Sequence, residues 1–201
     1  MNLLLLLKQT KKQKLNHNYN STFFHLEKPS EQSDGFFYIY EMEKAIIHSP
    51  LGTTLIYCDE IGVTKIEVIE EALEISSEIP SGLQNAVLQL QEYFEGKRTQ
   101  FTFSIHPKGT AFQQKVWAEL VNIPYGTTCS YLDLAKKLGD VKAIRAVAAA
   151  NGKNPLWIVV PCHRVIGSDG SLTGYAGGLW RKKWLLEHEN PSAQKSLFAF
   201  L

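Results

Sequence analysis

Between residues 45 and 105, short apolar runs alternate with turn residues in a regular pattern. Residues 45–70 consist of β-branched and aromatic runs that Pro-Leu-Gly and Ile-Gly interrupt, which is typical of β-hairpins. Residues 85–96 have a helical period and end at Gly96. The apolar side of this helix consists of Val87, Leu90, Tyr93 and Phe94. Residues 99–105 alternate as a strand does. These patterns predict that the first half forms a small α+β domain, which supports the rest of the protein and contains no catalytic residues.

The pattern becomes helical after residues 106–110, which we interpret as a linker. Thr110 can cap a helix. Its predicted apolar stripe is Phe112, Val116, Trp117, Leu120 and Val121. A second helix, 130–139, opens with Ser130 and Asp133 in a capping-box-like pair. A third, 140–152, follows after almost no loop and ends in Asn-Gly.

Two short helices joined by a tight turn that contains glycine have the geometry of a helix-turn-helix. The second of them, 140–152, is rich in alanine and carries Lys142 and Arg145. Small side chains let a helix approach a surface closely, and a long cation can reach from it into a DNA groove. A packed helical hairpin without a DNA contact explains the same pattern, so both interpretations stay open at this point.

Composition narrows the class of protein. The 201 residues are 44% apolar, which suits one large or two small globular domains. Three cysteines, Cys58, Cys129 and Cys162, form no even disulfide framework and indicate a reducing, intracellular setting. No apolar run is long enough for a membrane span. The start has five leucines followed by basic residues, unlike a signal peptide. We expect residues 1–35 to be poorly ordered, and Met42 is a candidate for the true start.

Charge is distributed unevenly along the chain, although the net charge is only +1. Residues 36–106 carry 4 basic and 11 acidic side chains, whereas residues 107–201 carry 12 basic and 6 acidic ones. A basic half beside an acidic half suggests that the basic half faces a polyanion. Uneven surface charge without such a partner is the alternative.

An apolar run, Ile158–Val160, precedes Pro161, and Cys162, His163 and Arg164 follow at once. We expect the run to be a strand. A structural buried cysteine is the common explanation, but Arg164 next to it is hard to bury. The cysteines and histidines here have no metal-ligand spacing. A hydrolase pair usually brings its histidine from elsewhere in the chain. The fourth interpretation, which stands beside these three, is a nucleophilic thiol with a neighbouring base and positive surroundings.

Several ordered blocks now resemble one family, the O6-alkylguanine-DNA alkyltransferases (methylated-DNA–protein-cysteine methyltransferases), and especially their bacterial Ogt-like branch. The blocks are "FQQKVWAELVNIPYGTTCSY", "RAVAAANGKNP", "PCHRVIG" and "GYAGGLWRKKWLLEHE". The resemblance covers about residues 42–190. It implies an α+β fold: a small ribonuclease-H-like α/β domain (42–106), then a mainly helical domain (107–190) with a winged-helix-like helix-turn-helix. Residues 1–41 would be an extension and 191–201 a tail.

The resemblance also implies roles for single residues. Cys162 matches the acceptor thiol, His163 its base acting through a water, and Glu189 the group that polarises His163. Arg145 matches the finger that fills the gap left by a flipped nucleotide. Tyr131 matches the tyrosine that promotes flipping and donates a proton near the base. Ala146, Ala148 and Asn151 would also face DNA. Asn154 would tie the turn before the thiol. The remaining matches line or border the guanine pocket: Val165 through its carbonyl, Tyr175, Ala176 and Lys182.

The implied reaction is a single transfer of an alkyl group from O6 of guanine, and also from O4 of thymine, in double-stranded DNA to the cysteine. The product thioether is stable, so the protein would react once. The resemblance calls for no metal, no organic cofactor, no membrane and no obligate protein partner, and we expect a monomer in the cytoplasm.

Three positions depart from the family pattern: Ala148 replaces a glycine, Trp157 stands where smaller residues are common, and Ala176 stands where some relatives have serine. The first bears on DNA affinity and the second on pocket width, unless Trp157 simply covers the core. The main alternative function is a non-enzymatic sensor of alkylated DNA, of the alkyltransferase-like type, but those proteins lack the acceptor cysteine. A regulator of the Ada type would need a cysteine-rich N-terminal metal domain. A plain DNA-binding module with a structural cysteine is the last alternative.

Overall fold

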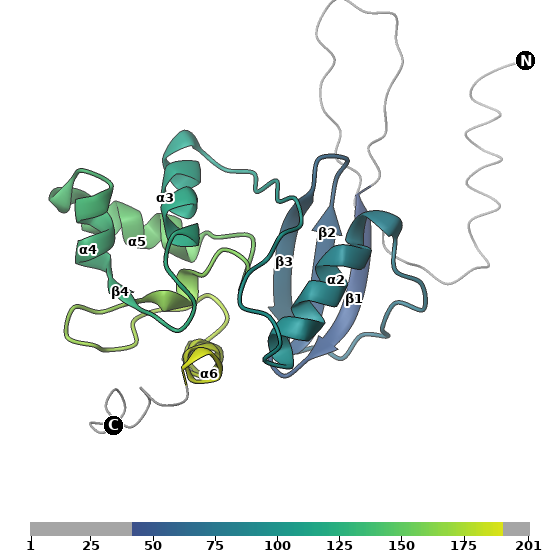
Figure 1. Cartoon of the computed structure of the whole chain (residues 1–201). Helices are drawn as coiled ribbons and strands as arrows, with labels where there is room; N and C mark the ends of the chain where they lie inside the picture. The colour runs from purple at the N-terminus through teal and green to yellow at the C-terminus, as the bar shows by residue number, and fades with distance from the viewer. Residues whose placement is uncertain (1–41, 191–201) are drawn as a thin grey trace, which may run out of the picture. The chain divides into compact units, whose positions relative to one another are not determined.

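A computed structural model describes residues 42–190, so the predicted extension (1–41) and tail (191–201) lie outside the described residues. An antiparallel sheet comes first, in the order β1 (Glu43–Ser49), β2 (Gly52–Cys58) and β3 (Val63–Ile69). Helix α2 (Ser81–Phe94) lies across one face of it, against β1 and β2 (Figure 1). The predicted hairpins are therefore confirmed. The helix begins at Ser81 rather than at residue 85, because Leu83 already belongs to its buried face.

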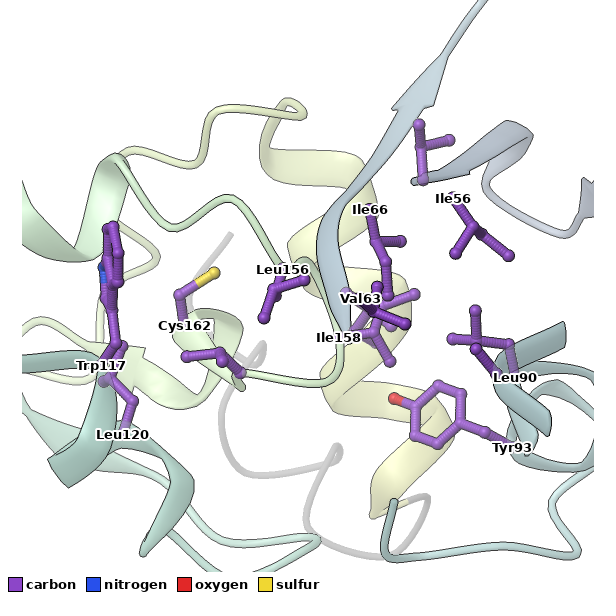
Figure 2. Packing of buried hydrophobic residues seen from close by; sticks show 14 of the residues in the cluster. Ile56, Val63, Ile66, Leu90, Tyr93, Trp117, Leu120, Leu156, Ile158 and Cys162 are labelled. Atoms are coloured by element: carbon purple, nitrogen blue, oxygen red, sulfur yellow. The ribbon is translucent and has the colours of Figure 1, made fainter. Parts of the chain in front are cut away.

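The two faces of the sheet bury side chains in two different hydrophobic clusters. Alternate residues such as Ala45, Ile56 and Ile66 enter the main core. Figure 2 shows Ile56 and Ile66 there with Leu90 and Tyr93 of α2. The opposite face carries a smaller cluster of Ile46, Leu55 and Tyr57. This is the period of two that the sequence pattern expresses. Burial of these apolar side chains is the main favourable contribution to folding.

The strand expected at residues 99–105 is not present; the prediction was wrong. Ile105 makes only an isolated bridge to Val63. The backbone before it is bonded to a side chain instead: Thr102 N–H donates to Oε1 of Gln89 at 2.8 Å. Phe101 packs against the ring of Tyr93. The alternation therefore reflects packing of an extended segment on α2, not a ladder with a neighbouring strand.

The second half is mainly helical, as expected. Its elements are α3 (Ala111–Val121), β4 (Cys129–Ser130), α4 (Tyr131–Lys137), the 3-10 turn η1 (Val141–Ala143), α5 (Ile144–Gly152), the 3-10 turn η2 (Cys162–Arg164), β5 (Val165–Ile166) and α6 (Leu179–Glu189). None of the helices in residues 42–190 is long and apolar enough to cross a membrane.

Helix α3 begins as the sequence predicts. The Thr110 hydroxyl accepts from Gln113 N–H, and the Gln113 side chain accepts from Thr110 N–H, so the capping box is complete. Only part of the predicted stripe is buried: Val116, Trp117 and Leu120. The predicted stripe was too wide, because Phe112 and Val121 at its ends are exposed.

The helix-turn-helix is formed by α4 and α5. Ser130 caps α4 by accepting from Asp133 N–H at 3.0 Å. The turn contains Gly139 at φ 90°, a left-handed conformation that favours glycine. The expected single helix 140–152 begins instead as the turn η1, which Asp140 caps, and continues as α5. Helix α5 packs against α3 and α4, so the pair belongs to the core and still leaves one face of α5 in solvent.

Candidate active site

The segment before Cys162 is a tight turn and not the expected strand. Ile158 has φ 72°, and Val160 N–H donates back to Leu156 O at 2.9 Å. Val159 N–H likewise donates to Trp157 O at 2.8 Å. The β-branched run gave a strand-like pattern because its alternate residues are buried, but backbone bonds within the run close it into turns.

Asn154 organises this turn. Its Oδ1 accepts from Leu156 N–H at 2.9 Å, and its Nδ2 donates to Val160 O at 2.8 Å. The same Nδ2 lies 3.1 Å from the sulfur of Cys162. One buried amide therefore both shapes the chain before the thiol and contacts the thiol itself.

Two strand contacts fix the turn to the rest of the protein. Leu156 bridges Ile66, with Ile66 N–H donating to Pro155 O at 2.8 Å, so the turn attaches to the edge strand β3. On the other side, β5 pairs in parallel with β4, with Val165 opposite Cys129. Because β4 leads directly into α4, and β5 directly follows the turn that carries Cys162, this pairing fixes the position of Cys162 relative to the helix-turn-helix.

Cys162 is almost fully buried, with 4% of its surface exposed, and packs in the main core (Figure 2). Burial raises the pKa of its thiol, while the Asn154 hydrogen bond and the positive charge of Lys182 oppose that shift. The thiol is therefore protonated at rest, and the Asn154 amide and the Lys182 charge partly offset the cost of burying the thiolate that forms once a base removes the proton.

Lys182 is a buried cation beside this thiol. Its Nζ donates to Val165 O at 2.7 Å and to Thr173 O at 3.0 Å, and it lies 5.9 Å from the centre of the Tyr131 ring. Burial lowers its pKa to about 8, and the attraction of Cys162 acts in the opposite direction. The carbonyl of Val165, expected to face the guanine, thus also holds Lys182.

His163 and Glu189 form the pair that the resemblance implied. His163 Nε2 donates to Glu189 Oε1 at 2.8 Å, and both side chains are buried. This bond leaves Nδ1 as the proton-accepting nitrogen, and Nδ1 has no hydrogen-bond partner among residues 42–190. Burial lowers the pKa of His163, while Glu189 raises it. The imidazole is therefore neutral at rest and able to take a proton.

Arg164 is buried too, contrary to expectation. Its Nε donates to Glu189 Oε2 at 2.8 Å, its Nη2 to Glu189 Oε1 at 3.0 Å, and its Nη1 to Ile123 O at 2.6 Å. A guanidinium can be buried where a carboxylate and a carbonyl satisfy its donors. Burial acts to raise the pKa of Glu189, but His163 and Arg164 together lower it below its usual range. Arg164 thereby gains a definite role, as the counter-charge of Glu189.

Tyr131 and Asn151 lie on the helix-turn-helix side of the thiol. Asn151 Nδ2 is 3.4 Å from Cys162 O and 3.5 Å from the Tyr131 hydroxyl. Burial raises the pKa of Tyr131, so its phenol stays a proton donor. Asn151 itself is buried, with 3% of its surface exposed. Its place does not fit the expected DNA contact, because α5 turns that side toward the core.

The other residues expected to face DNA are accessible. Arg145 and Ala146 are exposed on α5, and Ala148 is half-buried. Val147 and Ala150, on the opposite side of the same helix, are buried. Arg145 therefore extends from an exposed helix face on which the neighbouring residues within α5, such as Ala146 and Ala149, are short, which suits close approach to a groove.

The predicted pocket wall is formed by the chain before α6. Tyr175 lies partly buried against Trp157, with ring centres 5.4 Å apart, and its hydroxyl acts to lower the pKa of the Cys162 thiol, against the larger effect of burial. Ala176 is exposed, and Gly177 after it is buried. A Cβ at Gly177 would lie only 2.4 Å from the Trp157 ring. Trp157 therefore covers part of the main core and contacts the segment that carries Tyr175 and Gly177, while its effect on pocket width stays a prediction.

Sequence reasoning missed one contributor to the site. Tyr93, predicted only as an apolar helix residue of the supporting half, donates its hydroxyl to Glu189 Oε1 at 2.9 Å. A tyrosine on a fully buried helix side was the available signal, since a buried phenol needs a polar partner. The first half thus reaches the site directly.

The arrangement suits transfer of a group to sulfur. A buried thiol accepts a hydrogen bond from an amide, the next residue in the chain is a histidine, and a carboxylate orients that imidazole. Among residues 42–190, no group of three or more histidine, cysteine or acidic side chains could hold a metal ion.

Comparisons with known proteins agree with this geometry. Residues 42–107 match the family model for the ribonuclease-like domain of 6-O-methylguanine DNA methyltransferase, and residues 111–191 match the family model for its DNA-binding domain. A methylated-DNA–protein-cysteine methyltransferase of Mycobacterium bovis is 44% identical over 158 residues, covering 77% of this chain and 96% of the relative. One from Methanosarcina barkeri is 44% identical over 151 residues, covering 72% of this chain and 94% of the relative.

A solved structure gives the same result. The crystal structure of Mycobacterium tuberculosis OGT in complex with DNA superimposes with a TM-score of 0.66 at 43% identity, covering 77% of this chain and 98% of the other. Both domain families match, and the relatives are covered almost completely, so the α+β architecture expected from the sequence is confirmed. The chain therefore belongs to the family of 6-O-methylguanine DNA methyltransferases.

Proposed function

We propose that this methyltransferase repairs DNA by direct reversal, taking the alkyl group from O6 of guanine in the duplex onto the sulfur of Cys162. Family membership supports DNA as the partner. The observation that carries the assignment of the acceptor is the buried Cys162 thiol, with Asn154 Nδ2 at 3.1 Å and, next in the chain, His163, which is hydrogen-bonded to Glu189. O4-alkylthymine is the second substrate we propose.

We propose that Cys162, His163 and Tyr131 carry out every proton transfer that the reaction needs. The Cys162 proton passes to Nδ1 of His163 through a water. The thiolate attacks the alkyl carbon, the S–C bond forms and the C–O6 bond breaks. The electron pair left on the base takes a proton from the Tyr131 hydroxyl, which His163 resupplies, so the thiol proton ends on guanine.

The base must leave the stack before the thiol can reach it, because Cys162 is buried. We assign that step to the exposed face of α5. Arg145 would enter the duplex and occupy the gap, while Ala146 and Ala148 let the helix approach the DNA backbone. Tyr131, at the start of α4, would turn the nucleotide toward the pocket bordered by Tyr175, Ala176 and the carbonyl of Val165.

The product is a thioether on Cys162, and nothing in this reaction removes it, so each molecule reacts once. The reaction as written needs neither a metal nor an organic cofactor. A monomer without an obligate protein partner, and a cytoplasmic location, remain predictions.

Mass spectrometry tests the acceptor. After incubation with duplex DNA containing O6-methylguanine, we expect a gain of one CH2 on the Cys162 peptide and none in Cys162→Ser. Cys129→Ser is the matched control, since Cys129 lies on the neighbouring strand β4 and should be dispensable. A duplex with O4-methylthymine tests the second substrate. Methyl found on another residue, or none despite DNA binding, would refute the proposal.

The alternative of a non-enzymatic sensor is not favoured, because the chain has a cysteine at the acceptor position and a base beside it. Tight binding of alkylated DNA without any mass gain is the result that would support the sensor.

A further inference from the structure

We infer that Tyr93 is a positioning residue for the acceptor thiol: its hydroxyl holds Oε1 of Glu189 and thereby keeps His163 a neutral proton acceptor. This inference rests on the acceptor role proposed for Cys162. It assigns a part in the reaction to the sheet-and-helix half of the chain, which otherwise only supports the fold.

The carboxylate of Glu189 is shared unequally. Oε1 accepts from His163 Nε2 at 2.8 Å, from Tyr93 OH at 2.9 Å and from Arg164 Nη2 at 3.0 Å. Oε2 accepts from Arg164 Nε at 2.8 Å and from Gly126 N–H at 3.3 Å. The oxygen that faces His163 therefore has two competing donors.

Competition on Oε1 weakens what Glu189 can do for a charged imidazole. A carboxylate stabilises an imidazolium by its charge and by accepting its proton, and each further donor on that oxygen reduces both effects. His163 is thus held in the right orientation and tautomer without being protonated in advance. A protonated His163 could not take the proton of Cys162.

The protonation and the orientation of the Tyr93 hydroxyl are both fixed by its surroundings. Burial, and then Glu189, raise its pKa well above the ordinary value of 10, so its hydroxyl stays a neutral donor throughout the range in which His163 titrates. Its ring direction is fixed by packing against Phe94, Phe101 and Tyr125. Figure 2 shows the hydroxyl turned toward α6, the helix that ends in Glu189.

Other titratable groups face the same cluster and belong to the balance. Arg164 on η2 and Lys182 on α6 lower the pKa of His163. Tyr125, from the segment before β4, interacts with Glu189 and Arg164. His188 donates its Nε2 proton to Tyr93 O at 2.7 Å. None of these is removed when the Tyr93 hydroxyl is deleted, so their contributions cancel in a comparison of Tyr93→Phe with the parent.

Tyr93→Phe in the full chain is the test, because phenylalanine keeps the ring contacts. We expect the titration of His163, followed by NMR of the imidazole in the unreacted protein, to move upward by about half a pH unit or more. The acidic limb of the rate of benzyl transfer from free O6-benzylguanine to Cys162 should move with it. Tyr57→Phe is the matched control, since Tyr57 is a buried tyrosine beside Glu67, on the other sheet face.

The outcomes are distinguishable. An unchanged His163 titration in Tyr93→Phe, or a rate that falls equally at every pH, would overturn the positioning role and leave only a structural one. Failure of the parent protein to take up the benzyl group would instead refute the acceptor function, while the NMR titration would still decide the role of Tyr93.

Discussion

Arg164 and Glu189 form a buried, two-point ion pair: Arg164 Nε donates to Oε2 at 2.8 Å and Nη2 donates to Oε1 at 3.0 Å. The pair joins η2, the turn that begins at Cys162, to the last residue of α6. It explains how an arginine can stand two residues after the acceptor without opening the core to water. It also makes Glu189 important for folding as well as for orienting His163.

Glu189→Gln should therefore destabilise the protein strongly. The substitution leaves the Arg164 guanidinium buried without a counter-charge, which costs roughly 3–5 kcal/mol of unfolding free energy. Urea unfolding at neutral pH measures it. Glu95→Gln is the control, because it breaks an exposed pair with Lys97 and should change stability by less than about 1 kcal/mol. Equal losses in both variants would contradict the account of the pair.

The buried Lys182 gives stability a distinctive alkaline dependence. Its pKa is about 8 in the folded protein, against 10.5 for an unperturbed lysine such as that of an unfolded chain. Between these values the unfolded state binds more protons, so this residue makes the free energy of unfolding rise with pH. In urea titrations, the free energy of unfolding of the parent minus that of Lys182→Met should become more positive from pH 8 to pH 10. Lys183→Met, at a partly exposed position of the same helix, is the matched control. A flat difference for Lys182→Met would refute the shift.

Arg145 should matter only where a nucleotide must be flipped. Arg145→Ala is expected to slow methyl removal from duplex DNA by roughly ten-fold or more, because the gap in the stack is left unfilled. Reaction with free O6-benzylguanine should stay within about two-fold of the parent. Lys142→Ala, which removes another exposed cation nearby, should weaken DNA binding but leave the duplex reaction at saturating DNA within about two-fold of the parent, whereas the Arg145→Ala loss should persist there. Equal rate losses on both substrates would exclude the finger role.

The contact between Gly177 and Trp157 can be tested by a double-mutant cycle. A methyl at Gly177 would lie 2.4 Å from the Trp157 ring, so Gly177→Ala should cost about 1–3 kcal/mol. The same substitution made together with Trp157→Ser should cost much less. Gly152→Ala, where nothing lies within 4 Å, should be neutral or stabilising. Additive effects of the Gly177 and Trp157 substitutions would show that the close contact is not the cause.

Local signals in the sequence predicted the fold well where a residue acts on its neighbours. Thr110 and Ser130 cap the helices expected of them, because capping depends on residues three positions apart. The β1–β2–β3 hairpins follow from period-two alternation and turn residues for the same reason. These features need no knowledge of distant parts of the chain.

Features set by distant partners were missed or misread. Val160 looked like strand because it is β-branched and buried, yet backbone bonds and the Asn154 side chain fold that run into a turn. Arg164 looked hard to bury, since its counter-charge lies at the far end of α6. Tyr93 was placed on the correct helix face, but periodicity does not show that its hydroxyl meets Glu189 across the domain boundary.

The central claim is a single, irreversible transfer to Cys162, and its most direct measurement is a count of guanines restored per protein molecule. The protein is mixed with a large molar excess of duplex O6-methylguanine DNA, and restored guanine and S-methylcysteine are quantified together at long times. We predict one restored guanine for each molecule, one methyl on Cys162, and no further reaction. More guanine restored than protein present, or restored guanine without methyl on Cys162, would contradict the account.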